Sequence, residues 1–185
     1  MELVTPSLAQ LDSYVAALRR GWSPDNVRGA AAAQEQLARI EQDAAALLAS
    51  LDDRLAQGAP IKLPDGSTAQ RLPGFVRWMW DGEFCGSIGF RWQPGTAALP
   101  PHVLGHVGYT VVPWKRGQGF ATQALLALLP EAHALGMPYV EITTDTDNLA
   151  SQRVIEKAGG VLFERFTQPA AYGGEPGLRW RIATA

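Results

Sequence analysis

Two glycines and two basic residues between positions 115 and 119 have the types and the spacing of an anion-binding turn. Lys115 and Arg116 precede Gly117 and Gly119, and a helix-forming segment follows at once. A glycine lets a ligand approach the backbone closely because it carries no Cβ. The free N–H groups at the start of a helix attract negative charge. We therefore predict a phosphate site formed by the backbone N–H groups of Gly117, Gln118, Gly119 and Phe120.

Two commoner phosphate-binding loops do not fit these residues. A Walker loop ends in Gly-Lys-Ser or Gly-Lys-Thr, whereas Phe120 and Ala121 follow Gly119 here. A dinucleotide-binding fingerprint that begins at Gly117 requires a small residue three positions after Gly119, where Thr122 is found. A different kind of phosphate loop must therefore account for the turn.

The residues around the turn resemble the pyrophosphate loop of the GNAT superfamily, the acetyl-CoA-dependent N-acetyltransferases. Arg116, Gly119 and Ala121 match the three defining positions of its Arg-x-x-Gly-x-Ala pattern, and a strand ending in Val-Val-Pro precedes them. A second segment, with Asn148 and a later Lys-x-Gly turn, resembles the family's Asn-containing helix and the turn after it. The two motifs occur in the family's order, and the resemblance covers roughly residues 74–182.

The resemblance implies acetyl-CoA as the acetyl donor and no metal ion. Val111 would give backbone contacts to the acetyl-pantetheine arm, at the place where two middle strands splay apart. Asn148 offers a donor and an acceptor to the pantetheine amides, although an Asn at this place can also simply cap its helix. The basic pair at 115–116 could likewise be only a solvated turn. The implied cofactor-binding residues are Val111, Arg116, Gly117, Gln118, Gly119, Phe120, Ala121 and Asn148.

Aminolysis of a thioester needs a neutral amine and a group that removes one proton. His106, with an ordinary pKa of roughly 6.5, precedes Val-Gly-Tyr, where many family members have Glu-x-Gly-Tyr. We expect His106 to act as the general base, directly or through a water; the alternative is a histidine hydrogen-bonded within the sheet. Glu141 on the following strand is a second candidate, because burial among apolar neighbours would raise its pKa. It could equally point to solvent.

The group that assists the leaving thiolate is harder to assign. The family often has a tyrosine seven residues after the Asn, but Ile155 occupies that position. Ser151 is the nearest hydroxyl on the same predicted helix, and it could hydrogen-bond the sulfur or bond back to its own helix. Tyr172 is another candidate. Cys85, the single cysteine, has no basic neighbour in sequence to lower its thiol pKa, so we expect direct transfer without a covalent enzyme intermediate.

Aromatic residues give a weaker indication of an acceptor site. The apolar loop at 94–101, with Trp22, Trp92 and Tyr172, is our hypothesis for its wall. Trp78 alternates with other residues along its strand, as do Trp80 and Trp92, and such a pattern is more typical of a core than of a substrate cage.

Composition restricts the class of protein. The chain has 185 residues, of which 46% are hydrophobic and 18% charged, and a net charge of −2. These values suit one globular domain, and the lack of basic excess disfavours nucleic acid as a partner. One cysteine allows neither an intrachain disulfide nor a cysteine metal cluster, which is typical of a reducing cytoplasm. Neither a secretion signal nor a run of about 18 apolar residues occurs. We therefore expect a cytoplasmic protein without a membrane partner.

The hydrophobic spacing predicts two N-terminal helices, then antiparallel strands, then alternating strands and helices. This order predicts an α/β fold of the GNAT type, with a mixed, mostly antiparallel central sheet, flanking helices and splayed middle strands. We expect one domain over 1–185, with the N-terminal helices in 1–56 and the sheet core and acetyl-CoA site in 74–182. The expected helices are 6–20, 28–55, 119–135 and 148–157, and the expected strands are 76–80, 85–92, 106–112, 139–143, 161–164 and 177–182.

Together these inferences predict an N-acetyltransferase that moves the acetyl group of acetyl-CoA directly to a primary amine of a small molecule or a peptide. One alternative is a non-catalytic acyl-CoA-binding or regulatory module of the same fold, which steady turnover with any amine would rule out. Another is a plain nucleotide-phosphate binder, which would prefer ATP to CoA. Exposed strand edges and the 28–55 helix could also support a homodimer.

Overall fold

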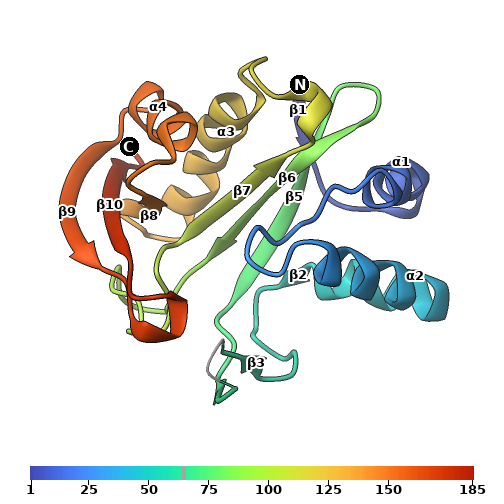
Figure 1. Cartoon of the computed structure of the whole chain (residues 1–185), viewed down its shortest axis with the longest axis horizontal. Coiled ribbons are helices and arrows are strands. Elements are labelled where there is room, and N and C mark those ends of the chain that lie inside the picture. The colour runs from blue at the N-terminus through green and yellow to red at the C-terminus, as the bar shows by residue number, and fades with distance from the viewer. Residues whose placement is uncertain (64–65) are drawn as a thin grey trace.

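The computed structural model describes residues 1–63 and 66–185, and for residue 171 the backbone alone (Figure 1). Its helices are α1 (Leu8–Arg19), α2 (Ala30–Ser50), α3 (Phe120–Ala134) and α4 (Leu149–Lys157), with short 3-10 turns η1 (Pro113–Lys115) and η2 (Ala170–Tyr172). Its strands are β1 (Glu2–Val4), β2 (Asp52–Asp53), β3 (Ile61–Lys62), β4 (Thr68–Ala69), β5 (Gly74–Trp80), β6 (Phe84–Arg91), β7 (Val107–Val111), β8 (Tyr139–Asp145), β9 (Val161–Thr167) and β10 (Pro176–Ala183).

The main strands form two antiparallel sheets that lie side by side. The first has the order β1-β5-β6-β7, with β2 also paired to β5, and the second has the order β8-β10-β9. β5 and β6 are joined by a tight turn at Asp81 and Gly82, where Gly82 has a φ of 102°. Among the described residues no hydrogen-bonded ladder joins β7 to β8. The structure therefore confirms a mostly antiparallel sheet that splits between its middle strands.

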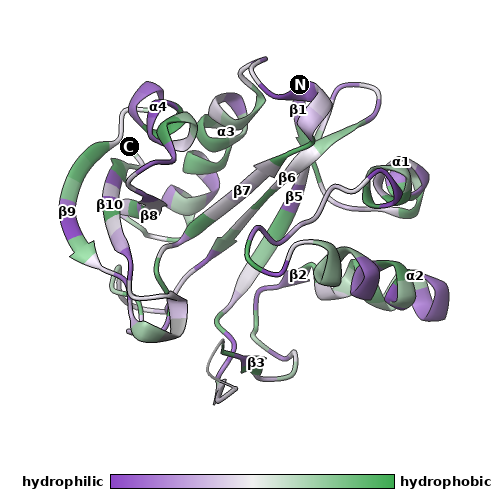
Figure 2. Cartoon of the chain, viewed as in Figure 1, coloured by the Kyte–Doolittle hydropathy of each residue, from purple (hydrophilic) through white to green (hydrophobic). Residues whose placement is uncertain are grey.

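Helices cover the strands from both sides, and the alternation of side chains along each strand decides which residue meets which helix. Along β5, Phe75 and Met79 belong to the larger apolar cluster with α3 and α4, whereas Trp78 belongs to the smaller cluster with α1. Figure 2 shows the apolar character of these strands in the middle of the molecule. In the smaller cluster Tyr14 stacks on Trp78 with ring centroids 4.5 Å apart.

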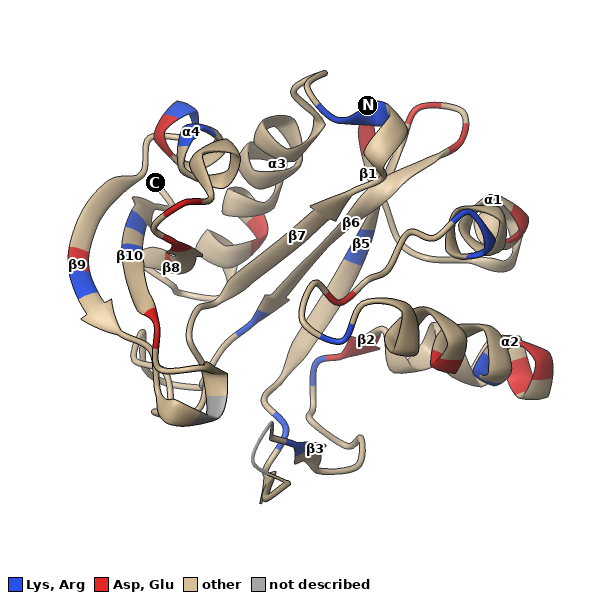
Figure 3. Cartoon of the chain, viewed as in Figure 1, with Lys and Arg blue, Asp and Glu red and all other residues tan. Residues whose placement is uncertain are grey.

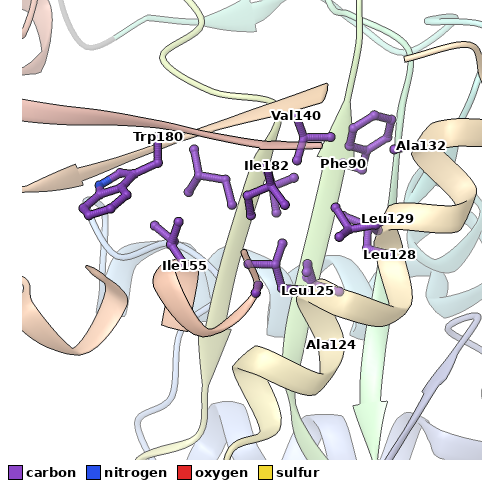
Figure 4. Packing of buried hydrophobic residues seen from close by; sticks show 14 of the residues in the cluster. Phe90, Ala124, Leu125, Leu128, Leu129, Ala132, Val140, Ile155, Trp180 and Ile182 are labelled. Carbon is purple, nitrogen blue, oxygen red and sulfur yellow. The ribbon is translucent and has the colours of Figure 1, made fainter. Parts of the chain in front are cut away.

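The larger cluster fixes α3 and α4 against both sheets. Leu125 and Leu128 of α3 and Ile155 of α4 have no exposed surface, and burial of each such side chain contributes about 2 kcal/mol. Figure 4 shows them packed against Val140 and Ile182 of the second sheet. The two sheets therefore share one core with α3 and α4, although no ladder joins β7 to β8 among the described residues.

The second N-terminal helix is shorter than the predicted 28–55. It is interrupted at Asp43, with a φ of −161° and a ψ of 94°, and the Asp43 carboxylate accepts a hydrogen bond from the Ala46 N–H at 2.9 Å. It ends at Ser50 because β2 pairs with β5 and uses the backbone groups that a longer helix would need. Leu55, the last residue of the predicted helix, is 76% exposed.

The shortest elements were not predicted at all. β1 pairs with the end of β5, and β3 pairs with β4. Two or three residues are too few to show a hydrophobic period, so only the pairing reveals them. Among the described residues no helix is both long and apolar enough to cross a bilayer. The single-domain organisation stays a prediction.

Candidate active site

The edge of β7 that faces β8 offers unpaired backbone groups. In an antiparallel ladder, alternate residues direct their N–H and C=O groups to the same neighbour. The Val112 N–H donates to the Cys85 carbonyl at 2.9 Å and the Arg91 N–H donates to the His106 carbonyl at 2.9 Å. Within β7, Gly108 and Thr110 are therefore the residues whose N–H and C=O groups pair with β6. Tyr109 and Val111 therefore direct their N–H groups into the split between the sheets. This is the edge on which Val111 was predicted to bind a ligand.

The two sheets touch at the closed end of this split, which we call the vertex. There the His106 N–H donates to the Glu141 carbonyl at 2.7 Å, and the Glu141 N–H donates to His106 Nδ1 at 2.9 Å. Gly105 passes so close that a Cβ on it would lie 3.0 Å from the Glu141 carbonyl oxygen. The vertex is thus locked by a side chain and two backbone segments.

His106 fits the sheet-bonded alternative better than the role of general base. Its side chain has no exposed surface, and its Nδ1 lone pair is already used by the Glu141 N–H. Burial, together with the charges of Arg91 and Arg181, lowers the pKa of His106 to about 4. Because Nδ1 accepts, the ring proton must be on Nε2, which is buried and makes no hydrogen bond within the described chain. With this tautomer, neither ring nitrogen of His106 can accept a proton from the split.

Glu141 is also engaged. Its carboxylate accepts from Arg181 at 2.9 Å and lies 3.9 Å from Arg179, on the sheet face away from α3. Two guanidinium groups compete for the lone pairs that a base would need. The structure therefore places both predicted bases at the vertex but uses each of them to hold strands together.

The predicted anion loop, residues 115–121, has the conformation that backbone anion binding requires. Gly117 and Gly119 have φ values of 78° and 80°, in the left-handed region that favours glycine. Gly119 is the N-cap of α3, so the first N–H groups of that helix, including those of Phe120 and Ala121, have no partner within the helix. The loop is exposed from Arg116 to Gly119. Free donors and a helix N-terminus thus converge on one exposed turn.

The two basic residues of the loop have different roles. Lys115 Nζ lies 2.6 Å from Asp81 and 2.8 Å from Glu83, so it ties the loop to the β5–β6 turn. Arg116 donates through Nε to the Val111 carbonyl at 3.3 Å and has no carboxylate partner in the described chain. That bond also places the loop directly at the open end of the β7 edge. Figure 3 shows this basic turn after β7.

Ser151 and Asn148 face the split from α4. The Tyr109 hydroxyl lies 2.6 Å from Ser151 Oγ, and the Ser151 N–H donates to Asn148 Oδ1 at 3.1 Å. Asn148 therefore caps its helix, as one of the two interpretations predicted, and its amino group makes no hydrogen bond within the described chain. Burial raises the pKa of Tyr109 to about 12, although the bond to Ser151 lowers it, so this hydroxyl stays protonated at neutral pH. Ile155 is fully buried in the core.

Tyr109 is the site residue that the sequence interpretation missed. It was treated only as part of the family's Gly-Tyr pattern, and its hydroxyl contact lies 42 residues away in the chain. The available signal was its position on β7, two residues from Val111 and therefore on the same face.

Other expected residues lie elsewhere. Trp92 is 7% exposed and Trp22 is 2% exposed, and they belong to different apolar clusters, so the structure does not bring the two together. Trp92 lines a hollow with residues 94–97 of the predicted loop, and the acceptor-site wall stays a prediction. Tyr172 donates its hydroxyl to the His102 carbonyl at 2.7 Å. Cys85 is fully buried, and burial raises its thiol pKa to about 12. Three or more His, Cys, Asp or Glu side chains do not converge as a metal site within the described residues.

The chain belongs to the GNAT acetyltransferase family. The model of the acetyltransferase (GNAT) domain matches residues 18–161. The match begins within α1 and includes β7, the anion loop, β8 and α4, so it extends further toward the N-terminus than the resemblance seen in the motifs. A comparison with curated proteins found no match.

Solved structures share the fold over nearly the whole chain. The acetyl transferase from Salmonella typhimurium that modifies the N-terminal serine of 50S ribosomal subunit protein L7/L12 has a TM-score of 0.64 at 15% identity, covering 98% of this chain and 93% of that one. The microcin C7 self-immunity acetyltransferase MccE, in complex with acetyl-CoA and AMP, has a TM-score of 0.54 at 11% identity, covering 98% and 91%. RimL, the ribosomal L7/L12 alpha-N-protein acetyltransferase, in complex with coenzyme A, has a TM-score of 0.55 at 14% identity, covering 98% and 92%.

Proposed function

We propose that this protein is an N-acetyltransferase that transfers the acetyl group of acetyl-CoA directly to a primary amine. The observation that carries the proposal is the continuity of two binding elements. The anion loop suits a pyrophosphate, and the β7 edge that begins at its foot presents unpaired N–H groups at Tyr109 and Val111 that suit the amides of a pantetheine arm. Acetyl-CoA bound in this way supplies an activated acetyl group. The acetyl-CoA complex of MccE and the CoA complex of RimL support this choice of donor.

In the proposed mechanism, backbone groups bind and orient the donor. The loop from Arg116 to Ala121 would hold the phosphates, and the amino group of Asn148 would bond an amide of the arm from the α4 side. The Val111 N–H and the Tyr109 N–H would fix the arm along β7. These donors are held in place by the ladder with β6 and by the cap of α4, so little order has to be gained on binding.

The reacting groups need a hydrogen-bond donor for the sulfur and a route for one proton. As the new bond forms between the amine nitrogen and the acetyl carbon, the carbon–sulfur bond breaks and the nitrogen gives up one proton. We propose that Tyr109 and Ser151 donate a hydrogen bond to the departing sulfur and that the amine proton passes to water. His106 and Glu141 would first have to give up their present bonds to act as bases, so we assign them to holding the vertex.

The test is a steady-state assay of CoA release with and without a panel of primary amines, with mass spectrometry of the products. An acetyltransferase releases CoA in proportion to the acetylated amine. Acetyl-CoA binding with no amine-dependent release across the panel would favour the non-catalytic acyl-CoA module, for which the engagement of both predicted bases is the supporting observation. Tighter binding of ATP than of CoA would favour the nucleotide binder.

A further inference from the structure

The apolar core of α3 and α4 fills one side of the split, so we take the opposite side as the approach for the amine. On that side, which we call the acceptor face, the strands next to the split carry every second residue, of which Ser87 and Thr110 are themselves buried. The acceptor face consists of Ser87, Gly89 and Arg91 on β6 and Gly108 and Thr110 on β7.

Two glycines lie opposite each other in the middle of the acceptor face. Gly89 pairs with Gly108, and neither has a positive φ. A Cβ on Gly89 would come no closer than 3.7 Å to another atom, and a Cβ on Gly108 would meet only Arg91, at 3.5 Å. Neither backbone conformation nor packing therefore requires glycine here. The effect of the pair is a bare stretch of sheet beside the vertex, with Gly108 itself exposed.

The guanidinium of Arg91 lies over this bare stretch. Its Nη2 atom is the one that a Cβ on Gly108 would meet, and its side chain is exposed to solvent. The other arginines on the same side of the sheets are occupied: Arg181 and Arg179 contact Glu141, and Arg179 also pairs with Glu164. Arg91 makes no side-chain hydrogen bond or ion pair within the described chain, so its charge is uncompensated.

The residues around Arg91 leave its positive charge available to a ligand. The Tyr172 hydroxyl of η2 donates to the His102 carbonyl, which ties the β9–β10 connection to the loop before β7. Protein atoms around Arg91 lower the pKa of its guanidinium, but an arginine stays cationic at neutral pH. An arginine without a carboxylate partner is free to bind an anionic ligand through two parallel hydrogen bonds.

We propose that Arg91 binds a carboxylate of the acceptor, so that the acceptor is an amino acid or another short amino-carboxylate laid over Gly89 and Gly108 with its amine at the vertex. The planar guanidinium can take a carboxylate through two parallel hydrogen bonds, which would orient the amine as well as bind the molecule. Gly89 and Gly108 leave space for the acceptor, and Arg91 would select acceptors that carry a carboxylate. This inference rests on the proposed acetyltransferase function.

The test compares acceptor pairs that differ only in the carboxylate: the L-amino acids and β-alanine against their carboxamides. For each pair that the enzyme acetylates, the carboxylate should have a kcat/KM at least about tenfold higher than that of its carboxamide. This is the size of effect expected for one charged hydrogen-bonding group. Arg91→Gln should raise the KM for the carboxylate until the pair is used equally, and Arg91→Lys should restore part of the difference. The KM for acetyl-CoA should not change. Arg19→Gln, an exposed arginine on α1, is the control and should leave both members unaffected.

Each result is decisive. Equal or better use of the carboxamides by the wild-type protein, or a preference that persists in Arg91→Gln, would overturn the inference while leaving acetyl transfer intact. Acetylation of none of the pairs, while other amines are acetylated, would overturn it as well. Failure to bind acetyl-CoA would instead defeat the proposed function, and this inference with it. Thermal unfolding of each variant shows whether it is folded, and we expect no change for Arg91→Gln because the side chain has no partner.

Discussion

The two sides of the split between β7 and β8 are built in different ways. On the donor side, the anion loop and the β7 edge present backbone groups, whose positions follow from a glycine-rich turn, a helix start and a strand ladder. On the acceptor face, the important groups are side chains: the Arg91 guanidinium and the absence of side chains at Gly89 and Gly108. The vertex, which His106 and Glu141 hold closed, lies between the donor side and the acceptor face. If the proposed function holds, the comparison teaches that the donor is recognised by chain geometry, and the acceptor by residue identity.

Because of this difference, we expect a change of backbone conformation on the donor side to weaken ligand binding more than any other single change. Gly119→Val places a β-branched residue at a φ of 80°, which strains the turn and moves the N–H groups at the start of α3. We expect the acetyl-CoA dissociation constant to rise at least about a hundredfold, since several donors are lost together. Isothermal titration calorimetry measures it.

The matched control is Gly136→Val at the other end of α3, where φ is 79° and no atom lies within 4 Å of a Cβ. It should cost a similar amount of stability and leave acetyl-CoA binding unchanged. Equal weakening by both variants would mean that strain in α3, rather than the loop donors, controls binding.

The vertex predicts a pH dependence of stability. His106 has a pKa of about 4 in the folded protein, below its value of 6.5 when unfolded. The unfolded chain therefore binds a proton that the folded chain does not, so this contribution is complete above pH 6.5 and is lost as the pH falls toward 4. The loss amounts to at most about 3 kcal/mol.

Urea unfolding of the wild type and of His106→Asn at several pH values isolates the effect. The asparagine keeps an acceptor for the Glu141 N–H but does not titrate. The difference in unfolding free energy between the two proteins should change between pH 7 and pH 4. If His106 is instead the general base, the variant will lose most of its kcat at every pH while the difference in stability stays flat.

The proposed hydrogen bond to the departing sulfur predicts a smaller loss of kcat, to which Tyr109 and Ser151 contribute together. Tyr109→Phe and Ser151→Ala should each lower kcat by about 10- to 100-fold with little change in the KM for acetyl-CoA, because the lost hydrogen bond matters most in the transition state. The double variant should be little worse than either single one if the hydroxyls act as a pair. If the double variant instead lowers kcat by the product of the two single losses, the two hydroxyls act independently.

The smallest effect separates the two basic residues of the loop. Arg116→Gln should weaken acetyl-CoA binding about three- to tenfold and reduce its dependence on salt, because an exposed cation contributes only screened attraction. Lys115→Gln should instead lower the melting temperature, since Lys115 holds Asp81 and Glu83, and should leave binding nearly unchanged. The reverse outcome would place the wrong cation at the phosphates.

The sequence predicted what is local and missed what depends on pairing. The turn at Gly117 and Gly119 and the cap at Asn148 are each set within a few residues, so their chemistry can be derived from spacing alone. The contacts of His106 with Glu141 and of Tyr109 with Ser151 join residues 35 and 42 apart in the chain. Only the strand register and the packing of α4 decide them.

The same reason accounts for the error in the second helix. Helical periodicity continued through Leu55, but a two-residue ladder with β5 ended the helix at Ser50. The acceptor face is an extreme case, because a glycine and an arginine on neighbouring strands carry no pattern of their own. Family membership defines the donor side well and leaves the acceptor side to the individual chain.

The most direct test of the account is a calorimetric titration of the wild-type protein with acetyl-CoA, with ATP as the control ligand. The account predicts micromolar binding of acetyl-CoA and at least about a hundredfold weaker binding of ATP, since only the CoA arm can use the β7 edge as well as the loop. No heat and no thermal stabilisation at millimolar acetyl-CoA, or equal affinity for the two ligands, would contradict it.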